Sequence, residues 1–168
     1  MATAHTSGKS MPKPIPTAEQ EVDAVELLIN DHEHVKALFE QYESLGERAL
    51  ASKKKLAAQI CLELTKHSTA EEEIFYPAVR AANKENEDMI DEAFVEHASA
   101  KQLIAQILAM EPDEPLYDAK IKVLSEQIAH HVEEEQGEMF PKARKAKLDL
   151  VALGAAIEQR KAQVGLPA

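Results

Sequence analysis

Tryptophan is absent from the 168-residue sequence, cysteine occurs once and glycine occurs five times. The single cysteine, Cys61, excludes an internal disulfide and fits a reducing compartment. We interpret Cys61 as a small buried side chain on a helix, because an unpaired cysteine behaves as a compact hydrophobic residue. The low glycine content, together with abundant Ala, Leu, Glu, Lys and Gln, favours an all-helical chain.

Long apolar runs and an excess of positive charge are also missing. No segment approaches the length of apolar sequence that spans a membrane, and residues 1–10 have no apolar core like that of a signal peptide. The net charge is −11, whereas phosphate binding requires an excess of Lys and Arg. We therefore expect a cytoplasmic protein without a nucleic-acid or membrane partner.

The composition predicts one domain preceded by a short arm. The length and the 45% hydrophobic content allow a single sizeable core. Residues 1–16 are small, polar and interrupted by proline, so we predict a flexible N-terminal arm there and a helical bundle with a C-terminal extension over 17–168. Thr17 begins a possible capping box for the first helix, which should run to about Leu45 with Gly46 as a left-handed stop.

An eleven-residue pattern occurs twice, sixty-four residues apart. His67 is followed by Glu71 after four residues and by Pro77 after ten, and His131 is followed by Glu135 and Pro141 at the same offsets. A His and a Glu four residues apart lie on one face of a helix. Imidazole and carboxylate together suit iron, manganese or zinc. The repeat therefore predicts a two-metal site to which each copy contributes half, and Pro77 should kink or end its helix just after the first His-Glu pair.

A second repeat adds one histidine to each half. His32 follows an Asp and His97 follows a Glu, sixty-five residues later. All the candidate ligands fall on the apolar stripes of their helices, which is typical of side chains facing the core of a bundle. The predicted ligands are His32, His67, Glu71, His97, His131 and Glu135.

We predict an all-α fold, an antiparallel up-down-up-down four-helix bundle with a short C-terminal helix. In this topology the first and third helices are diagonal, as are the second and fourth. After the first helix, we expect the second helix to start near Ser52 and the third to span about 87–110. The fourth should begin after an N-cap at Asp113, and the C-terminal helix should cover about 148–164.

These motifs resemble the hemerythrin-like, or HHE cation-binding, domains. The similarity extends from about residue 20 to 163, and its strongest segments are DHEHVKALF, HSTAEEEIFYPAV, EHASAKQLI and HVEEEQGEMFP. The resemblance implies a cofactor of two non-haem iron ions in a four-helix bundle, with an oxo or hydroxo bridge. It also implies that Glu71 and Glu135 bridge the irons, that the four histidines are terminal ligands, and that dioxygen, peroxide or nitric oxide is the partner.

The sequence departs from the oxygen-carrying hemerythrins at two positions. Those proteins have a further histidine where this chain has Lys101, and an aspartate one place beyond the position of Glu135. The chain therefore resembles the bacterial type, with four histidines and two glutamates. We expect Lys101 and Lys36 to lie along the edge of the core with their amines in solvent, and His34 to face the surface.

Further polar residues lie near the predicted ligands along the helices. Metal-bound histidines usually donate their second ring nitrogen to a carboxylate or carbonyl. The candidates for this role along the helices are Glu63, Glu72, Glu133 and Glu134. Tyr42 lies on the inner stripe of the first helix, where core packing is the expected role of its ring.

Several functions remain open at this point. The first is a di-iron protein that binds or reacts with a small oxidant in sensing, storage or stress response, with a peroxidase- or catalase-like side activity left open. The second is an iron-binding or iron-sensing module without turnover, and the third is a structural bundle without metal. A ferritin-like carboxylate oxidase fits less well, because that family places Glu before His at a spacing of three.

Overall fold

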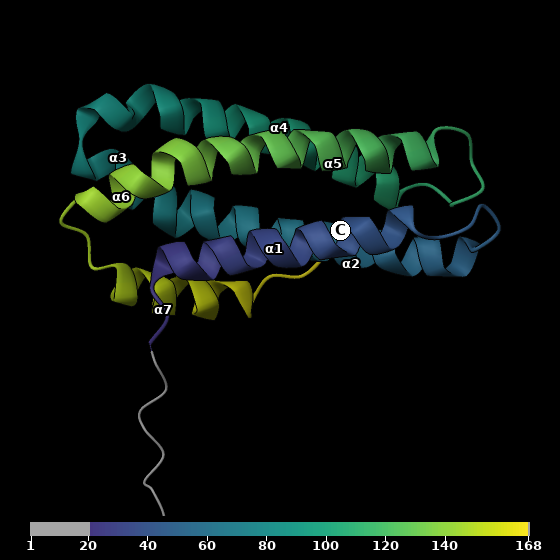
Figure 1. Cartoon of the computed structure of the whole chain (residues 1–168), viewed down its shortest axis with the longest axis horizontal. Coiled ribbons are helices and arrows are strands. Elements are labelled where there is room, and N and C mark those ends of the chain that lie inside the picture. Colours follow the sequence, from purple (N-terminus) through teal and green to yellow (C-terminus); the bar gives the residue numbers. More distant parts are fainter. Residues whose placement is uncertain (1–20, 168) are drawn as a thin grey trace, which may run out of the picture.

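The computed structural model describes residues 21–167, so the predicted arm at 1–16 and the capping box at Thr17 lie outside the described residues. Within that range every regular element is helical (Figure 1). The long helices are α1 (Ala24–Glu43), α2 (Leu50–Ala70), α4 (Glu87–Leu108) and α5 (Tyr117–Glu134). The shorter elements are η1 (Glu71–Phe75), α3 (Tyr76–Ala82), η2 (Lys84–Asn86), η3 (Glu135–Met139), α6 (Phe140–Lys145) and α7 (Leu150–Lys161).

The four long helices form the predicted antiparallel bundle. α1 packs against α2 and α5, and α4 packs against the same two helices, so α1 and α4 are diagonal to each other. None of the helices within residues 21–167 is long and apolar enough to cross a membrane.

The core consists of two hydrophobic clusters with a polar layer between them. One cluster gathers around Phe75, Tyr76 and Phe140, near the two chain reversals at α3 and α6. The other gathers around Ile60, Ile104 and Leu124, along the opposite half of the bundle. The predicted ligands lie along each helix between these clusters, so the polar layer is enclosed by apolar side chains on both sides.

Both His-Glu pairs lead directly into a π-helical turn. The Tyr76 amide donates to the Glu71 carbonyl, and the Phe140 amide donates to the Glu135 carbonyl, each five residues back. The next residue is a proline, which has no amide hydrogen and whose ring crowds the preceding turn of an α-helix. The kink expected at Pro77 is therefore a wide turn, after which the helix continues as α3. The same wide turn precedes Pro141, and that helix continues as α6.

Three predicted helix boundaries were wrong. α1 ends at Glu43, and the described glycines, including Gly46, have no positive φ. α5 begins at Tyr117 after Leu116, the described non-glycine residue with a positive φ of 73°, rather than after Asp113. α1 itself begins at Ala24, where burial begins, with the Asp23 carboxylate accepting from the Glu26 amide at 2.9 Å.

The predicted C-terminal helix is present as α7, which packs on α1, α2 and η1. Ile157 is fully buried against the cluster around Phe75. Gly154 makes this approach possible, because a Cβ at that position would lie 2.6 Å from the Val22 carbonyl oxygen. Figure 1 shows α7 below α1, on the side of the bundle away from α4.

Candidate metal centre

The six predicted ligands lie together in the centre of the bundle, and all are buried. Glu71 is 0% exposed and Glu135 is 1% exposed, and the four histidines are 4–6% exposed. Burial of two carboxylates costs several kcal/mol unless positive charge or hydrogen bonds compensate. The donor atoms fall into two groups, each with atoms within 4.8 Å of one another.

We call the first group site 1. It lies between α1 and α2 and includes a carboxylate oxygen of Glu135, which follows directly after α5. His32 Nε2 is 3.1 Å from His67 Nε2 and 3.1 Å from Glu135 Oε2. His67 Nε2 is in turn 3.1 Å from Glu71 Oε1. Four donor atoms therefore converge on one point from three chain segments.

Site 2 has the same composition and lies between α4 and α5. His97 Nε2 is 3.0 Å from His131 Nε2 and 3.3 Å from Glu71 Oε2. His131 Nε2 is 3.3 Å from Glu135 Oε1. The predicted pairing of the repeated patterns is thus reproduced in space, with one hairpin at each site.

Glu71 and Glu135 each contribute one oxygen to each site. Such a carboxylate can bridge two cations and partly neutralise both of them. On the side of site 1, Glu71 Oε1 and Glu135 Oε2 are buried and have no hydrogen-bond partner among the described residues. A buried oxygen without a partner is unfavourable by about 1–3 kcal/mol or more, and a cation between the two oxygens would remove that cost.

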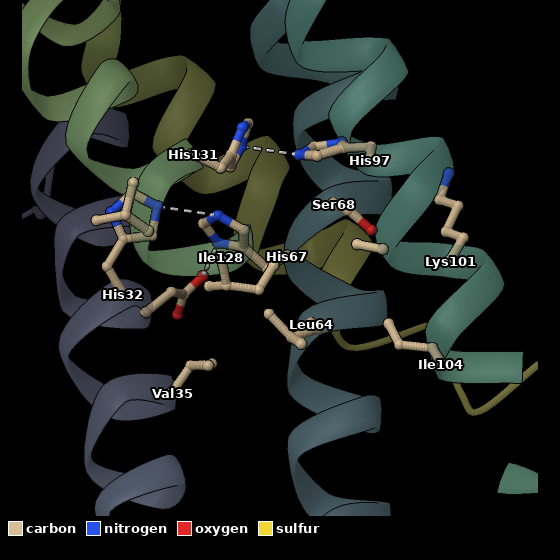
Figure 2. Close-up of a pocket in the computed structure, with 13 residues that line it drawn as sticks. His32, Val35, Leu64, His67, Ser68, His97, Lys101, Ile104, Ile128 and His131 are labelled. Carbon is tan, nitrogen blue, oxygen red and sulfur yellow. Dashed lines mark hydrogen bonds and ion pairs between the residues drawn. The ribbon is translucent and has the colours of Figure 1, made fainter. Parts of the chain in front are cut away.

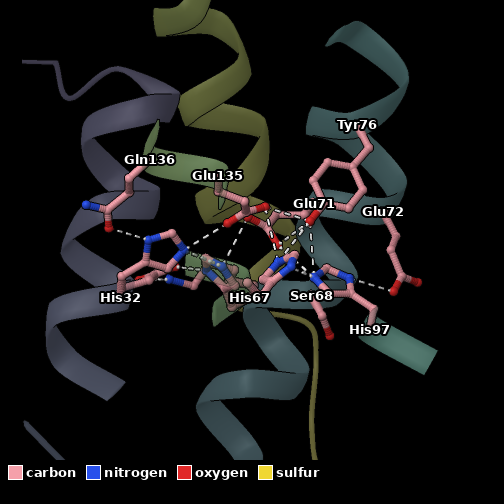
Figure 3. A network of polar contacts seen from close by, with 12 residues as sticks. His32, His67, Ser68, Glu71, Glu72, Tyr76, His97, Glu135 and Gln136 are labelled. Carbon is pink, nitrogen blue, oxygen red and sulfur yellow. Dashed lines mark hydrogen bonds and ion pairs between the residues drawn. The ribbon is translucent and has the colours of Figure 1, made fainter. Parts of the chain in front are cut away.

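The outer nitrogen of each histidine contacts an oxygen acceptor (Figure 3). His32 Nδ1 lies 2.9 Å from Gln136 Oε1, and His97 Nδ1 lies 2.9 Å from Glu72 Oε1. His67 Nδ1 lies 3.1 Å from Asp31 Oδ2, and His131 Nδ1 contacts Glu96 Oε2. A ring that donates its Nδ1 hydrogen outward presents the Nε2 lone pair inward, which is the orientation of a metal ligand.

Charge within the site shifts the pKa values of its groups. Burial alone lowers the pKa of the His67 imidazole, but the Glu71, Asp31 and Glu135 carboxylates outweigh it and raise the pKa to about 10. Burial is likewise outweighed at His131, where Glu135 and Glu96 raise the pKa to about 11. Without metal, therefore, protons on these rings balance the buried carboxylates.

Burial opposes ionisation of both central carboxylates, yet their neighbours hold them charged. The imidazoles of His131 and His32 keep the pKa of Glu135 well below its usual range. Glu71 also has a lowered pKa, because its contacts with His67 and His97 outweigh burial and the repulsion from Glu135.

Tyr76 is a further residue of site 2, and the sequence analysis did not identify it. Its hydroxyl donates to Glu135 Oε1 at 2.6 Å and lies 3.3 Å from Glu71 Oε2. The same oxygen is 3.1 Å from His97 Nε2 and 3.3 Å from His131 Nε2. Burial and the two carboxylates raise the pKa of the phenol well above its usual value.

Phe140 occupies the position of Tyr76 in the second copy of the repeat, since each follows its glutamate by five residues. The Phe140 ring stacks on His32 at 5.6 Å between centroids, whereas the Tyr76 ring lies 5.3 Å from that of His97. Each aromatic ring therefore contacts the histidine of the opposite hairpin. Only the ring at site 2 carries a hydroxyl.

A small cavity of about 30 Å³ is lined in part by the four histidines (Figure 2). Its remaining lining is largely apolar, including Val35, Leu64, Ile104 and Ile128. This volume is enough for a molecule of a few atoms.

The other polar residues considered from the sequence fall into two groups. Glu72 contacts a ring nitrogen of His97, as considered from the sequence. Both Glu72 oxygens also lie 2.7 Å from Lys101 Nζ, so Lys101 pairs with Glu72 rather than with a predicted metal ligand. Tyr42 is buried as expected, with its hydroxyl donating to Asp118 at 2.6 Å. The remaining candidates contact no predicted ligand: Glu63 pairs with Lys66, Glu134 pairs with His130, and Glu133, His34 and Lys36 are exposed.

Three further residues contact the outer nitrogens of the histidines and were not predicted from the sequence, namely Asp31, Glu96 and Gln136. A signal was present for two of them, because Asp31 and Glu96 directly precede the histidines of the second repeat. Asp31 and Glu96 each contact a histidine of the neighbouring helix. Each copy of the repeat therefore contains such an acid, which we call the outer acid, as well as the ligand.

The fold and the buried His/Glu groups define a cation-binding helical bundle. The chain belongs to the hemerythrin family, defined by the hemerythrin HHE cation binding domain, which matches residues 23–143. The suspected resemblance is thereby confirmed.

Two known proteins are similar to the chain over most of its length. A crystal structure of a hemerythrin HHE cation binding domain-containing protein from Mycobacterium kansasii has a TM-score of 0.71 and 26% identity, covering 84% of this chain and 86% of that one. A protein of Nostoc sp. named DNA nickase is 28% identical over 126 residues, which is 75% of this chain and 35% of that protein. The chain thus spans about a third of the length of this curated relative.

Proposed function

We propose that the chain binds two non-haem iron ions and, through them, binds or reacts with a small oxidant such as dioxygen, peroxide or nitric oxide. Sensing, storage or stress response would be its role. The observation that carries this proposal is the pair of four-donor sites that share two carboxylates. When bound, iron would supply a reversible change of oxidation state and open positions for a small ligand.

The spacing of the donors fits metal ions of this size. Metal–nitrogen and metal–oxygen bonds of about 2.1 Å at right angles place neighbouring donors about 3.0 Å apart. Neighbouring donors in site 1 are 3.1 Å apart, and those in site 2 are 3.0–3.3 Å apart. Four neutral imidazoles and two carboxylates suit iron, with manganese and zinc as competitors that the same donors accept.

Tyr76 extends the donor set of site 2. Its hydroxyl oxygen lies 2.6–3.3 Å from all four donors of that site, which is the spacing of an additional ligand. Tyr76 would serve as the fifth donor of site 2, and its phenol proton would pass to solvent when a metal binds. The phenol also positions Glu135 in the absence of metal through their hydrogen bond.

The surroundings suit a small, weakly polar oxidant. The cavity lined by the four histidines has a volume of about 30 Å³ and a largely apolar lining. Such a lining excludes bulk water and large substrates, while a diatomic molecule or peroxide can be accommodated.

A second candidate function is iron binding or iron sensing without turnover. The observation in its favour is that Glu71 Oε1 and Glu135 Oε2 are buried without a hydrogen-bond partner among the described residues, because a cation there would remove a cost of burial. Metal binding would then contribute directly to folding stability, and the folded population would report iron occupancy. Nicking of DNA is not part of the proposal, since the net charge of −11 gives no excess of cations for phosphate.

Metal analysis combined with optical spectroscopy tests the proposal. Protein expressed with ample iron should contain about two irons per chain, absorb in the near ultraviolet when oxidised, and change spectrum with dioxygen, peroxide or nitric oxide. Stable iron loading without any spectral response to the three oxidants would favour the sensing function. A colourless protein with zinc or without metal would contradict both.

A further inference from the structure

A cleft of about 260 Å³ lies between α4 and the segment α5–η3–α6, and it is separate from the small apolar cavity. Its lining includes two buried residues of site 2, His131 and Glu135. It also includes six further carboxylates, namely Glu85, Asp88, Glu92, Glu96, Glu134 and Glu138. The cleft therefore joins surface acids to the metal centre.

The carboxylates form two facing rows. Asp88, Glu92 and Glu96 follow one another at intervals of four on α4, so they share a face of that helix. Glu134 and Glu138 form the second row across the cleft. Like charges so arranged are unfavourable for stability but attract and concentrate cations.

Positive charge is scarce among the residues that line the cleft. Lys142 is the lysine among them, and it pairs with Glu138 Oε1 at 2.7 Å. His130 Nε2 lies 3.3 Å from Glu134 Oε1 and 3.8 Å from Glu96 Oε1. Glu85, Asp88 and Glu92 have no cationic partner among the described residues, so the cleft remains negative. At the buried part of the lining, Glu135 directs Oε1 toward site 2, 3.3 Å from His131 Nε2.

The corresponding face of the other hairpin is built differently. The repeat offsets map Glu92 onto Leu27, and map Glu134 and Glu138 onto Ala70 and Ile74. These three apolar side chains belong to the hydrophobic cluster that also contains Ile157 and Leu153 of α7. α7 thus covers one face of the duplicated bundle, and the equivalent face is acidic and forms the cleft.

We propose that the cleft between α4 and α5 is the route by which divalent cations reach the two-metal centre, an inference that rests on the proposed metal binding. Exposed Asp88, Glu92 and Glu138 attract the cation. Glu96 lies along the route and contacts His131 Nδ1, so it connects the cleft to site 2. Metal therefore reaches site 2 before site 1.

Uptake of Co²⁺ by the metal-free full-length chain tests this route, with the visible absorption of bound Co²⁺ followed by stopped flow. The triple variant Asp88→Asn, Glu92→Gln, Glu138→Gln should take up Co²⁺ at least about tenfold more slowly, because electrostatic attraction controls the encounter. Added salt should slow the wild type more than the variant. The final stoichiometry and spectrum should not change, since none of the three residues is a predicted ligand.

A matched variant controls for overall charge. Glu47→Gln, Glu126→Gln, Glu158→Gln removes three exposed carboxylates that do not line the cleft. Its uptake should match that of the wild type within about twofold. An unchanged rate in the cleft variant, or equal slowing in both triple variants, would overturn the route while leaving the metal centre intact. Failure of the wild type to bind Co²⁺ would contradict the proposed metal binding itself.

A second acidic surface provides an alternative path to be tested in the same way. Glu33 and Glu40 line a cleft between α1 and α5 that includes His32 and Lys36. Glu33→Gln, Glu40→Gln should leave the uptake rate unchanged. Slow uptake in this variant together with normal uptake in the cleft variant would place the route at site 1 and contradict the inference.

Discussion

The two halves of the metal centre have the same predicted ligands but different surroundings. Site 1 has Phe140 against His32, and its outer acid Asp31 is held by Lys161 of α7 at 2.5 Å. Site 2 has the Tyr76 hydroxyl among its donors, and its outer acid Glu96 lines an acidic cleft. The duplicated hairpins therefore have the same kinds of donor residues and differ in the residues that surround those donors.

This comparison indicates a division of tasks between the halves. We expect a metal at site 1, beside α7 and an aromatic ring, to exchange slowly, and a metal at site 2, beside an acidic cleft, to exchange more readily. The additional oxygen at site 2 would also make two bound metals electronically different. Variants that remove or enlarge this difference test it.

The largest expected effect follows from removing a shared carboxylate. Glu135→Gln preserves volume but removes an anionic oxygen from both sites, so affinity for both metals should fall by at least about 100-fold. Metal content after dialysis against a weak chelator measures the effect. Glu138→Gln, three residues along the chain, is the control and should retain the wild-type metal content.

A contrast between the halves should appear when one terminal histidine is removed. His32→Ala should empty site 1 and preserve one metal at site 2, because Glu71, His97, His131 and Glu135 remain. His97→Ala should do the reverse and preserve the metal at site 1. Titration with Co²⁺ should give about one equivalent in each variant. Loss of both metals in both variants would show that the sites bind only as a unit.

The metal-free protein should lose stability in alkaline solution. The folded pKa values of His67 and His131, about 10 and about 11, lie above the model-peptide value of 6.5. Their contribution is therefore fully present below pH 6.5 and is lost as pH rises through about 10 to 11, for a total of several kcal/mol.

Denaturant titrations of the metal-free protein between pH 6 and pH 11 measure this loss. The metal-loaded protein should show little of it, because metal holds the imidazoles neutral at every pH in this window. Equal pH dependence with and without metal would argue against coordination by these rings.

The packing of α7 beside site 1 can be weakened by adding one methyl group. Gly154→Ala places a Cβ 2.6 Å from the Val22 carbonyl oxygen, so α7 must shift and stability should fall by about 1–3 kcal/mol. Gly137→Ala is the matched control, since its Cβ meets nothing within 4 Å and should leave stability unchanged or raise it by up to about 1 kcal/mol. Urea unfolding compares the two variants. A neutral Gly154→Ala would show that α7 is not tightly packed.

The smallest expected effect is a change in visible absorption when Tyr76 and Phe140 are altered. Tyr76→Phe makes site 2 resemble site 1, and it should abolish visible phenolate-to-iron absorption while retaining both metals. Tyr76→Phe combined with Phe140→Tyr moves the hydroxyl to site 1 and should restore absorption at a shifted wavelength. An identical visible spectrum in the wild type and Tyr76→Phe would exclude phenolate ligation.

Sequence periodicity was sufficient to predict the ligand cluster. His67 and Glu71 are four residues apart, so an α-helix fixes them on one face, and the repeat requires the same of His131 and Glu135. The bundle and the identity of its diagonal helices followed from four long helices joined by short connections. That these residues bind metal stays a prediction until metal is measured.

Tyr76 was not predictable from the same periodicity. Five residues along an α-helix correspond to about 140° around the axis, which places Tyr76 away from the face of Glu71. The π-helical turn at 71–75 widens the helix and brings the two residues onto one face. The cover by α7 was equally hidden, because it depends on the close approach at Gly154 and not on a local motif.

Diffraction from crystals of the iron-loaded protein at the iron absorption edge locates bound iron directly. Two anomalous peaks are expected in each chain, one among His32, His67, Glu71 and Glu135, and one among His97, His131 and the same two glutamates. The peak at site 2 should also contact the Tyr76 oxygen. A single peak, or none at these residues in iron-loaded crystals, would contradict a two-metal centre with shared carboxylates.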